Sequence, residues 1–417
     1  MFFSSVEVVR GDSGTLTAMT RPMKTLFHQA FPAYSLNRDL QILFTSNLFA
    51  SFGDGLTIYL LPLFIRNLNA TPENVGFLYS VLMIASATTI IPGGLLAERF
   101  DLKKIMIVGW AVWVPVPLLF ALATDWTQMI PAMFFYGILF SGPASSSYIV
   151  GRAEKGKMVS TFSTLASAWG LGYMFAPTVA GYLAETAGMQ CVFFLTALFY
   201  LLTTIMLTQI STQTSQKTGV AGEEMRTESK GAVFKRQMMF HFSVILAAVF
   251  FTLSLVFPLV PQFLSDVYRY DFAHIGVLGS FTYFGGSVLS IVLGRIGDKY
   301  GRAAPISAAM ALVALSLGIF VSSSNFALLM VASFLRGASF PMWAFIGATV
   351  GSIAPSASRA RWISLVQTTA QSASIMAPYV GGVLYSSSAT MPFLVSIIAS
   401  LTLAFLAPLR LLKEETQ

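Results

Sequence analysis

Two ionisable residues, Asp54 and Arg336, lie inside long apolar runs of this sequence, where charged side chains are rare. On insertion scales, each costs about 2.5–3.5 kcal/mol at the centre of a bilayer, so each is expected to serve a function. Asp54 continues a polar stripe that begins with Asn47 and Ser51, at the i, i+4 and i+7 spacing of one helical face. A carboxylate there can take up and release a proton, and an arginine can favour its charged form or hold an anionic group. The alternatives are a static ion pair and a helix-packing hydrogen bond within the Gly-Asp-Gly segment around Asp54.

The composition defines the setting of these charges. The chain has 417 residues, of which 55% are apolar and 10% charged, and its mean hydropathy is +0.71. Soluble domains carry about 25% charged residues, so the composition excludes a water-soluble globular protein. It also excludes a disordered chain, a disulfide-rich secreted domain and a collagen-like chain. The one cysteine, Cys191, cannot form an internal disulfide.

Twelve apolar runs are long enough for a membrane helix, which needs about 20 mostly apolar residues. They are too long for the strands of a barrel and lack the alternation of such strands. We therefore predict an all-α membrane protein with 12 transmembrane helices. The predicted spans are 40–64, 75–96, 105–123, 129–150, 158–183, 191–209, 239–264, 275–293, 304–321, 326–350, 362–384 and 391–412.

The basic residues predict the orientation, because positive charges concentrate on the cytoplasmic side of membrane proteins. Of the 25 Lys and Arg residues, 21 lie in the two tails and in the loops after even-numbered spans, and Arg410 lies at the end of the last span, next to the second tail. The loops after odd-numbered spans hold only Arg66 and Arg269. We therefore predict a multi-pass protein of the cell (inner) membrane with both termini cytoplasmic. The net charge of +7 then records topology and gives no indication of nucleic-acid binding.

The spans also predict the domain organisation. We expect a cytoplasmic tail over 1–38, a six-helix bundle over 39–209, a cytoplasmic loop over 210–238, a second bundle over 239–412 and a tail over 413–417. The loop is polar and rich in Ser, Thr and Gly, which is typical of a flexible linker. The first tail lacks the apolar core of a signal peptide. It is either an amphipathic arm or an upstream extension, since Met19 or Met23 could begin the protein.

Several motifs recur about 200 residues apart and in the same order. Gly76 and Gly276, Glu98 and Asp298, and Gly137 and Gly337 are each separated by 200 residues. The segment APTVAGYL around Pro177 precedes APYVGGVL around Pro378 by 201 residues. Such self-similarity predicts two six-helix halves related by a parallel pseudo-two-fold repeat.

The loops after the second and eighth spans resemble the signature loop of the major facilitator superfamily, Gly-x-Leu-Ala-Asp-Arg-x-Gly-Arg-Lys. The second copy, Gly294-Arg295-Ile296-Gly297-Asp298-Lys299-Tyr300-Gly301-Arg302, fits well. The first copy, from Gly94 to Lys104, departs at Glu98, Asp101 and Leu102. A further pattern, Gly-x-x-x-Gly-Pro-x-x-x-Gly, is commonest among the drug/proton antiporters of that superfamily. It is similar to the residues Gly172, Ala176, Pro177 and Gly181.

The resemblance implies a secondary transporter with alternating access and a substrate site near the midplane between the halves. Helices 1, 4, 7 and 10 of that fold line a central cavity. Asp54 lies 11 residues before Ile65 and Arg336 lies 11 residues after Asn325, so each is about 17 Å below the predicted outer surface at 1.5 Å per residue. We therefore expect both to face the cavity. The other expected cavity residues are Asn47, Ser51, Ser141, Ser145, Tyr148, Phe340, Trp343, Gln367 and Gln371.

The two signature loops are expected to act as latches at the cytoplasmic face. Their glycines allow helices to approach closely, and Glu98 and Asp298 place an anion where a facing helix N-terminus attracts it. In the superfamily such contacts favour the outward-open state. The alternative is that the charges only anchor the loops at the membrane surface. The expected latch residues are Gly94, Glu98, Arg99, Lys103, Gly294, Asp298, Lys299, Gly301 and Arg302.

Prolines among small residues mark the fifth and eleventh spans. A proline inside a membrane helix frees a carbonyl group and bends the helix, and small residues permit tight contact. Two interpretations stay open: a bend that lets the halves rock, and simple close packing. The residues are Gly172, Pro177, Gly181, Pro378, Gly381 and Gly382.

Other signals argue against an enzyme. Residues 151–158 nearly match a phosphate-binding P-loop but lack its Ser or Thr and follow a membrane helix, so we expect no ATP hydrolysis. The three histidines lie far apart, and no cluster of Cys, His and acids indicates a metal or another cofactor.

The predicted function is proton-coupled export of a small, partly hydrophobic compound, because the expected cavity residues are few, aromatic and weakly polar. A proton-coupled importer of a sugar or an organic anion is the alternative that Arg336 favours. A membrane sensor without transport is a third. The expected partners are a small-molecule substrate, a proton or Na⁺ as coupling ion, and the lipid bilayer, and we expect a monomer.

Overall fold

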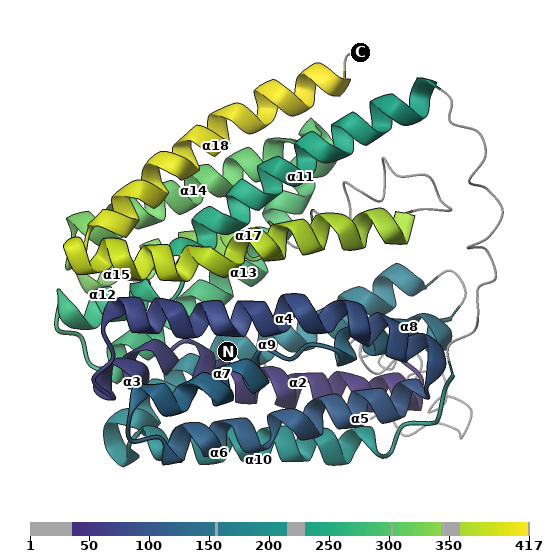
Figure 1. Ribbon diagram of the computed structural model, residues 1–417, viewed down its shortest axis with the longest axis horizontal. Coiled ribbons are helices and arrows are strands. Elements are labelled where there is room, and N and C mark those ends of the chain that lie inside the picture. Colours follow the sequence, from purple (N-terminus) through teal and green to yellow (C-terminus); the bar gives the residue numbers. More distant parts are fainter. Residues whose placement is uncertain are drawn as a thin grey trace, which may run out of the picture.

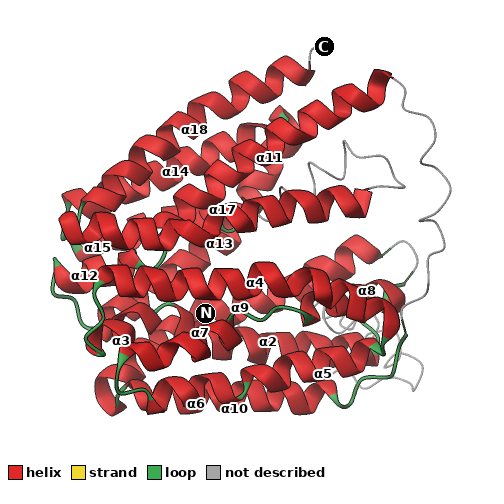
Figure 2. Ribbon diagram, viewed as in Figure 1, coloured by secondary structure: helices red, strands yellow, loops and turns green. Residues whose placement is uncertain are grey.

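The computed structural model describes residues 36–154, 157–214, 230–301, 303–342, 345 and 359–415. These residues are helical throughout, apart from loops and one isolated bridge between Asp101 and Thr214 (Figure 2). Most of the predicted first tail and of the predicted central loop lies outside this part of the chain. The first group of helices is α2 (Arg38–Ile58), α3 (Leu61–Asn67), α4 (Pro72–Arg99), α5 (Leu102–Trp113), α6 (Pro115–Leu122), η2 (Trp126–Gln128), α7 (Met129–Tyr136), α8 (Ser141–Arg152), α9 (Met158–Ala187) and α10 (Met189–Leu207). The second is α11 (Lys230–Val256), α12 (Leu259–Asp266), α13 (Phe272–Tyr300), α14 (Ala303–Ser322), α15 (Phe326–Arg336), η3 (Gly337–Ser339), α17 (Arg359–Ser387) and α18 (Met391–Glu415).

Each predicted span coincides with one or more of these helices, as far as the structure describes it. Seven helical stretches in this part of the chain are long and apolar enough to cross a membrane. They are Arg38–Asn67, Pro72–Arg99, Leu102–Leu122, Met189–Leu207, Phe242–Asp266, Phe272–Tyr300 and Ala303–Ser322. The all-α membrane fold is therefore confirmed, whereas the count of 12 membrane helices is confirmed only in part. Several spans consist of two helices because a break interrupts them, and Pro115 stands at the first turn that follows one break.

Equivalent contacts in the two groups confirm the internal repeat. A Cβ added to Gly137 would lie 2.2 Å from the carbonyl oxygen of Leu82, and one added to Gly337 would lie 2.5 Å from that of Thr282. Leu82 and Thr282 are themselves 200 residues apart. The same glycine thus lets the fourth span approach the second in one half and the tenth approach the eighth in the other.

The two groups touch at one end and diverge toward the other, on the right of Figure 1. A Cβ on Gly76 of α4 would lie 2.2 Å from the Pro378 oxygen of α17. The repeat-related pair does the same, because a Cβ on Gly276 of α13 would lie 2.3 Å from the Pro177 oxygen of α9. These two crossings hold the halves together at the end that we predict to face outward.

The buried apolar side chains follow the same division. The largest cluster draws from both halves, including Leu56 and Val75 of the first and Leu259 and Ile275 of the second. Two smaller clusters each stay within one half, around Leu40 to Leu207 in the first and Phe242 to Ala370 in the second. The shared core is therefore at the touching end, and each half keeps its own core where the halves diverge.

Candidate functional site

Asp54 lies on α2 among three tyrosines, with a relative exposure of 5%. The hydroxyls of Tyr136, Tyr173 and Tyr200 all donate hydrogen bonds to its carboxylate, that of Tyr200 over 2.9 Å to Oδ1. These tyrosines come from α7, α9 and α10, so four helices of the first half converge on one carboxylate. No basic side chain forms an ion pair with Asp54 in the described part of the chain. Three hydroxyl donors replace the water that such a buried acid would lose.

Tryptophans continue this cluster into a cavity of the first half. Trp113 contacts the rings of Tyr136 and Tyr200 at 5.6 and 5.7 Å between centroids, and Trp169 stacks on Tyr173 at 5.9 Å. The cavity holds about 200 Å³. Its walls include Asn47, Ser141 and Ser145, which the sequence predicted as cavity residues, together with Trp110, Trp113 and Trp169.

Arg336 lies at the end of α15 and lines a cavity of about 280 Å³ in the second half. It is 7% exposed. Its Nη2 donates to the Phe257 carbonyl oxygen over 3.5 Å, and its guanidinium lies 5.9 Å from the centre of the Phe257 ring. The predicted cavity residues Phe340 and Gln371 line the same space.

Asp54 and Arg336 do not pair directly, so the alternative of a static ion pair is wrong for this conformation. Tyrosines connect them instead. Tyr173, which binds Asp54, stacks on Tyr283 of α13. Tyr283 interacts electrostatically with both Asp54 and Arg336. One aromatic contact between the halves therefore separates the buried acid from the buried base.

The repeat gives these two centres a common origin in the fold. Tyr136 is the last residue of α7 and Arg336 is the last residue of α15, and in each half the helix ends there, before a glycine. The two positions are 200 residues apart. One copy donates a hydroxyl to an acid, and the other donates a guanidinium to a carbonyl group.

One predicted cavity residue, Ser51, lies in a contact between helices. Ser51 is fully buried and donates to the carbonyl oxygens of Leu48 and Ala168, because α9 approaches α2 closely at Gly172. At Ser51, the polar face of α2 therefore packs against α9 and does not line a cavity. Gln367 is half-buried on α17 and lines none of the described cavities. Trp343 lies outside the described residues.

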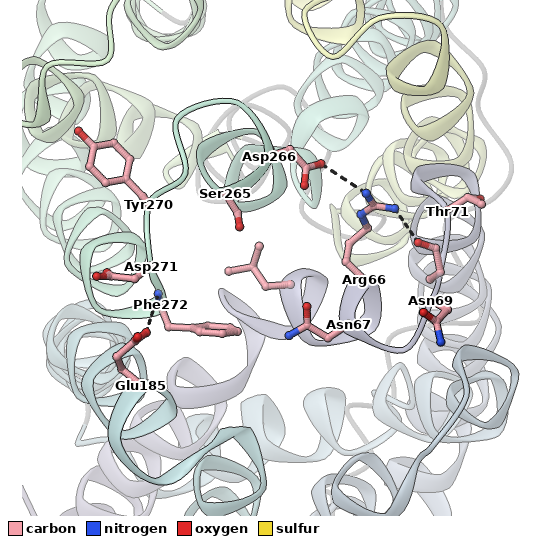
Figure 3. Close-up of a pocket in the computed structure, with 12 residues that line it drawn as sticks. Arg66, Asn67, Asn69, Thr71, Glu185, Ser265, Asp266, Tyr270, Asp271 and Phe272 are labelled. Carbon is pink, nitrogen blue, oxygen red and sulfur yellow. Dashed lines mark hydrogen bonds and ion pairs between the residues drawn. The ribbon is translucent and has the colours of Figure 1, made fainter.

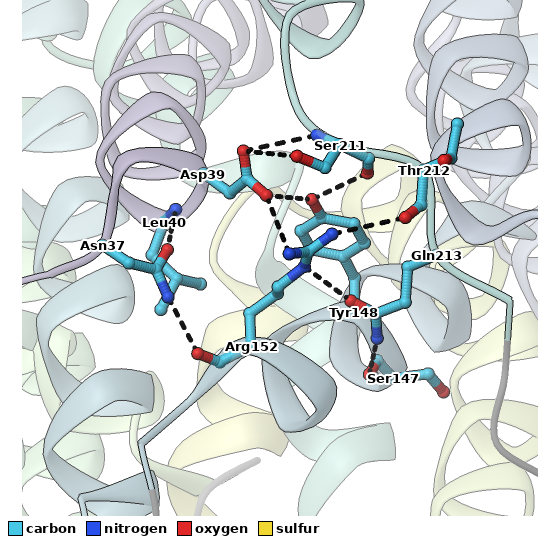
Figure 4. A network of polar contacts seen from close by, with 9 residues as sticks. All are labelled: Asn37, Asp39, Leu40, Ser147, Tyr148, Arg152, Ser211, Thr212 and Gln213. Atoms are coloured by element: carbon cyan, nitrogen blue, oxygen red, sulfur yellow. Dashed lines mark hydrogen bonds and ion pairs between the residues drawn. The ribbon is translucent and has the colours of Figure 1, made fainter.

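Tyr148, also predicted to line the cavity, lies instead in a polar network at the diverging end (Figure 4). Its hydroxyl donates to Asp39 over 3.1 Å and to the Ser211 carbonyl oxygen over 2.9 Å. Arg152 lies above the Tyr148 ring and pairs with Asp39 at 3.3 Å. The network joins α2, α8 and the chain that follows α10, so the role of Tyr148 is anchoring.

The predicted helix-bend residues make close contacts. Pro177 and Pro378 lie inside the continuous helices α9 and α17. Cβ atoms on Gly181 and Gly382 would lie 2.3 and 2.4 Å from carbonyl oxygens of the opposite half. Gly381 approaches the Leu255 carbonyl group in the same way, within its own half. This geometry favours the close-packing interpretation at these positions.

The first glycine of each signature loop faces open space in this conformation. A Cβ on Gly94 or Gly294 would meet no atom within 4 Å beyond its chain neighbours and its own helix backbone. The exposed side chains of Glu98, Arg99 and Asp298 form no ion pair in the described part of the chain, and Lys103 donates only its backbone amide, to Asp101. Lys299 lies over the ring of its neighbour Tyr300. Arg302 lies outside the described residues.

The departure of the first loop from the signature has a structural reason. Gly301 ends α13 with φ +83°, a left-handed conformation that favours glycine. Asp101, at the matching position, has φ −61° and caps α5 by accepting hydrogen bonds from the Lys103 and Lys104 amides. The first half therefore turns with a capping aspartate where the second turns with a glycine.

A polar contact closes the touching end (Figure 3). Arg66 pairs with Asp266 of the other half at 3.6 Å, and Tyr385 donates to the same carboxylate oxygen over 3.1 Å. The Phe272 amide donates to Glu185 over 3.3 Å, again between halves. These groups surround an open cavity of about 630 Å³. The sequence had marked Arg66 only as a topology signal.

Sequence reasoning missed the tyrosines Tyr136, Tyr173, Tyr200 and Tyr283. The chain has 14 Tyr and 36 Phe, so no single aromatic residue stands out. The internal repeat could have identified Tyr136. Tyr136 precedes Gly137, just as Arg336 precedes Gly337, and these two glycines are equivalent in the repeat.

Two groups of apolar helices that share one core and enclose an acid and a base define a multi-pass membrane transporter. The chain belongs to the Major Facilitator Superfamily, whose model matches residues 43–272 and 242–417. It is similar to the multi-drug resistance efflux pump PmrA homolog of Lactococcus lactis subsp. lactis (strain IL1403), with 27% identity over 274 residues, 63% of this chain and 67% of that protein. It is also similar to the quinolone resistance protein NorA of Staphylococcus aureus (strain Mu50), with 20% identity over 165 residues, 39% of this chain and 42% of that protein.

Solved structures share the fold at low identity. A nucleoside transporter, NupG, matches with a TM-score of 0.73 at 14% identity over 89% of this chain and 98% of its own. A POT family transporter in complex with 5-aminolevulinic acid matches with a TM-score of 0.74 at 15% identity over 90% of this chain and 96% of its own. These likenesses support the fold and leave the substrate open.

Proposed function

We propose that the protein exports a small, partly hydrophobic compound in exchange for protons. It works by alternating access, in which one central site opens in turn to each side of the membrane. The observation that carries this proposal is the Asp54 carboxylate, buried under three tyrosine hydroxyls within the membrane-spanning part of the first half. Such a group is costly to keep charged and gains function from exchanging a proton. Its position makes Asp54 the coupling site. A proton is preferred over Na⁺ as the coupling ion, because the tyrosine hydroxyls around Asp54 point their hydrogens at the carboxylate. A metal ion would need oxygen lone pairs directed at it instead.

The orientation of the protein in the membrane indicates which conformation of the transport cycle this structure represents. The distribution of Lys and Arg supports cytoplasmic termini, which puts the diverging end of the halves on the cytoplasmic side. The conformation is then inward-open, with bundles over 39–209 and 239–412 as the rocking units. The shared core and the Gly76–Pro378 and Gly276–Pro177 crossings are the contacts that must part for outward opening.

Export is favoured over import by two observations. The relatives reported above are named multi-drug and quinolone resistance proteins. The first-half cavity is walled by three tryptophans and few polar groups, which suits a partly apolar compound. Proton-coupled import of an organic anion is the second candidate, because Arg336 lies in the second-half cavity.

The test is flux in sealed vesicles of defined orientation, with and without a pH gradient, using a panel of apolar dyes, sugars and organic acids. Export predicts that substrate and protons move in opposite directions. Movement in the same direction would establish the importer instead. No flux for any compound of the panel, with the protein folded, would contradict transport and favour a sensor.

A further inference from the structure

Arg336 is a buried cation without an anionic partner in the described part of the chain. Its protein contacts are a carbonyl oxygen at 3.5 Å and the face of the Phe257 ring. Its other electrostatic partners, Tyr59 and Tyr283, are phenols, which are ordinarily uncharged at neutral pH. Asp54, the other ionisable group at this depth, is hydrogen-bonded by tyrosines of its own half. Within the described part of the chain, no anion therefore compensates this positive charge.

Compensation is energetically required at such a place. A charge that leaves water for a low-dielectric surrounding is costly unless an opposite charge and hydrogen bonds replace the lost hydration. The 3.5 Å contact to Phe257 is long for a hydrogen bond and supplies only a partial charge. A planar guanidinium that meets no carboxylate among the described residues is suited to bind one through two parallel hydrogen bonds.

The cavity beside Arg336 indicates what else the anion carries. Its volume of about 280 Å³ is at the small end for ligand pockets, which hold roughly 300–1,000 Å³. Most of its wall is apolar, from Leu253, Val313, Leu317, Phe257 and Phe340. The polar groups Ser254, Ser339, Ser374 and Gln371 stand among them. Inorganic anions would leave the apolar wall unused, whereas an aromatic or short aliphatic acid would fill it.

We propose that this cavity binds an apolar monocarboxylate, with its carboxylate on Arg336 and its apolar body against Phe257 and Phe340. This deepens the proposed function and rests on it for the direction of transport: the exported compound is an amphipathic organic acid. Met83 of the first half also lines the cavity, so a bound acid touches both halves. Gln371 ties α17 to Ser86 of α4 over 2.5 Å, which places the same cavity next to a contact that must change when the halves rock.

The experiment is thermal unfolding and equilibrium binding of the full-length protein in detergent with four probes: benzoate, benzamide, sodium chloride and sodium phosphate. Benzoate is expected to raise the Tm and to bind saturably, and its neutral isostere benzamide is not. Chloride and phosphate at equal ionic strength are expected to leave the Tm unchanged. Equal stabilisation by benzoate and benzamide, or none by benzoate at millimolar concentration, would overturn the proposal. If chloride stabilised the protein as much as benzoate does, the claim that the ligand has an apolar part would be contradicted.

Arg336→Gln and Arg336→Lys locate the site. The Kd of benzoate is expected to rise by roughly thirtyfold or more in Arg336→Gln, as for a buried charge pair that loses one partner. Arg336→Lys keeps the charge without the planar fork and is expected to retain part of the affinity. Arg38→Gln, at an exposed position of α2, is the matched control. If Arg336→Gln does not fold, the comparison of benzoate with benzamide on the unchanged protein still decides.

Flux separates this proposal from the proposed function. Benzoate binding that depends on Arg336, without any proton-coupled flux, would keep the site and contradict the exporter. Proton-coupled export of neutral compounds, with no Arg336-dependent binding of acids, would keep the exporter and contradict the site.

Discussion

The ring of Tyr173 stacks on the ring of Tyr283 with 4.8 Å between centroids and 18° between planes. Tyr173 belongs to α9 of the first half and donates to Asp54, whereas Tyr283 belongs to α13 of the second half and interacts electrostatically with Arg336. The stack therefore joins the two buried charges across the surface along which the halves must slide. Rocking that separates α9 from α13 breaks it, and any change at Asp54 that moves Tyr173 is felt by the second half.

Asp54→Asn is expected to abolish the use of a pH gradient. The amide cannot take up or release a proton, so net transport driven by the gradient should fall by roughly tenfold or more, while substrate exchange at equal pH persists. Flux in vesicles measures both. Asp125→Asn, at the partly exposed residue that caps η2 outside the cavities, is the control. Full activity with intact pH dependence would remove Asp54 as the coupling site.

Tyr200→Phe is expected to lower the stability by about 1–3 kcal/mol, because the Asp54 carboxylate loses one of three buried donors. Tyr182→Phe on the exposed face of α9 should change it by less than about 0.5 kcal/mol. A double-mutant cycle with Asp54→Asn then isolates the interaction. Additive effects of the two substitutions would show that the hydroxyl and the carboxylate are not coupled.

Gly276→Ala is expected to weaken the touching end of the halves, since its Cβ would lie 2.3 Å from the Pro177 oxygen. Overpacking costs about 1–3 kcal/mol, so labelling of Ser265→Cys in the outer cavity, in a Cys191→Ser background, should accelerate at least about fivefold. Gly318→Ala, where the new Cβ would face open space, is the control. Unchanged labelling in Gly276→Ala would mean that this crossing does not keep the outer end closed.

Asp271→Ala is expected to lower stability by about 0.5–2 kcal/mol at neutral pH, because Asp271 caps α13 through the His274 amide at 2.8 Å. Burial raises the pKa of the Asp271 carboxyl, but the hydrogen bonds from the His274 amide and ring outweigh it, so the pKa is below its ordinary value. The carboxylate thus contributes stability above the unfolded-state pKa of about 3.9, and this is lost as pH falls through the lower folded pKa.

The internal repeat supplies the control for this cap. Thr71 caps α4 at the position 200 residues earlier and has no titratable group. Thr71→Ala should therefore cost a similar amount at every pH. The comparison is made by thermal unfolding from about pH 5 downward, the range in which a carboxyl group titrates. A pH-independent loss in Asp271→Ala would contradict the role of its carboxylate.

Asp298→Asn is expected to slow transport without changing the Tm in this conformation, because Asp298 is exposed and forms no ion pair in the described part of the chain. The substitution is expected to destabilise the outward-open state, in which the latch would form. Labelling from the outer side should therefore decrease. Unchanged kinetics together with unchanged accessibility of both faces would count against the latch.

The sequence predicted the fold well because membrane helices and an internal repeat leave strong local signals. An offset of 200 residues pairs Gly137 with Gly337, and the structure gives both the same close contact. Charges within apolar spans are equally visible, which is why Asp54 and Arg336 could be selected without coordinates. The breaks within spans were not predicted, since residues such as Gly137 fit both a continuous and an interrupted helix.

The surroundings of the two charges could not be predicted, because a helical stripe does not say which neighbour it faces. Ser51 shares the face of Asn47 by spacing, yet it packs against α9 whereas Asn47 lines a cavity. Tyr148 fits the same helical spacing as Ser141 and Ser145, yet it binds Asp39 at the end of the bundle. Partners such as Tyr173 and Tyr200 are more than 100 residues away in sequence, so only the fold brings them to Asp54.

The equivalence of Tyr136 and Arg336 has an evolutionary consequence. Duplication created two copies of one position, and substitution in one copy left the other intact. Under the roles proposed here, the two copies now have different functions: Tyr136 binds the proton-carrying Asp54, and Arg336 binds the substrate. A lineage can therefore change what it carries by altering the second copy while its energy source, kept by the first, stays as it was.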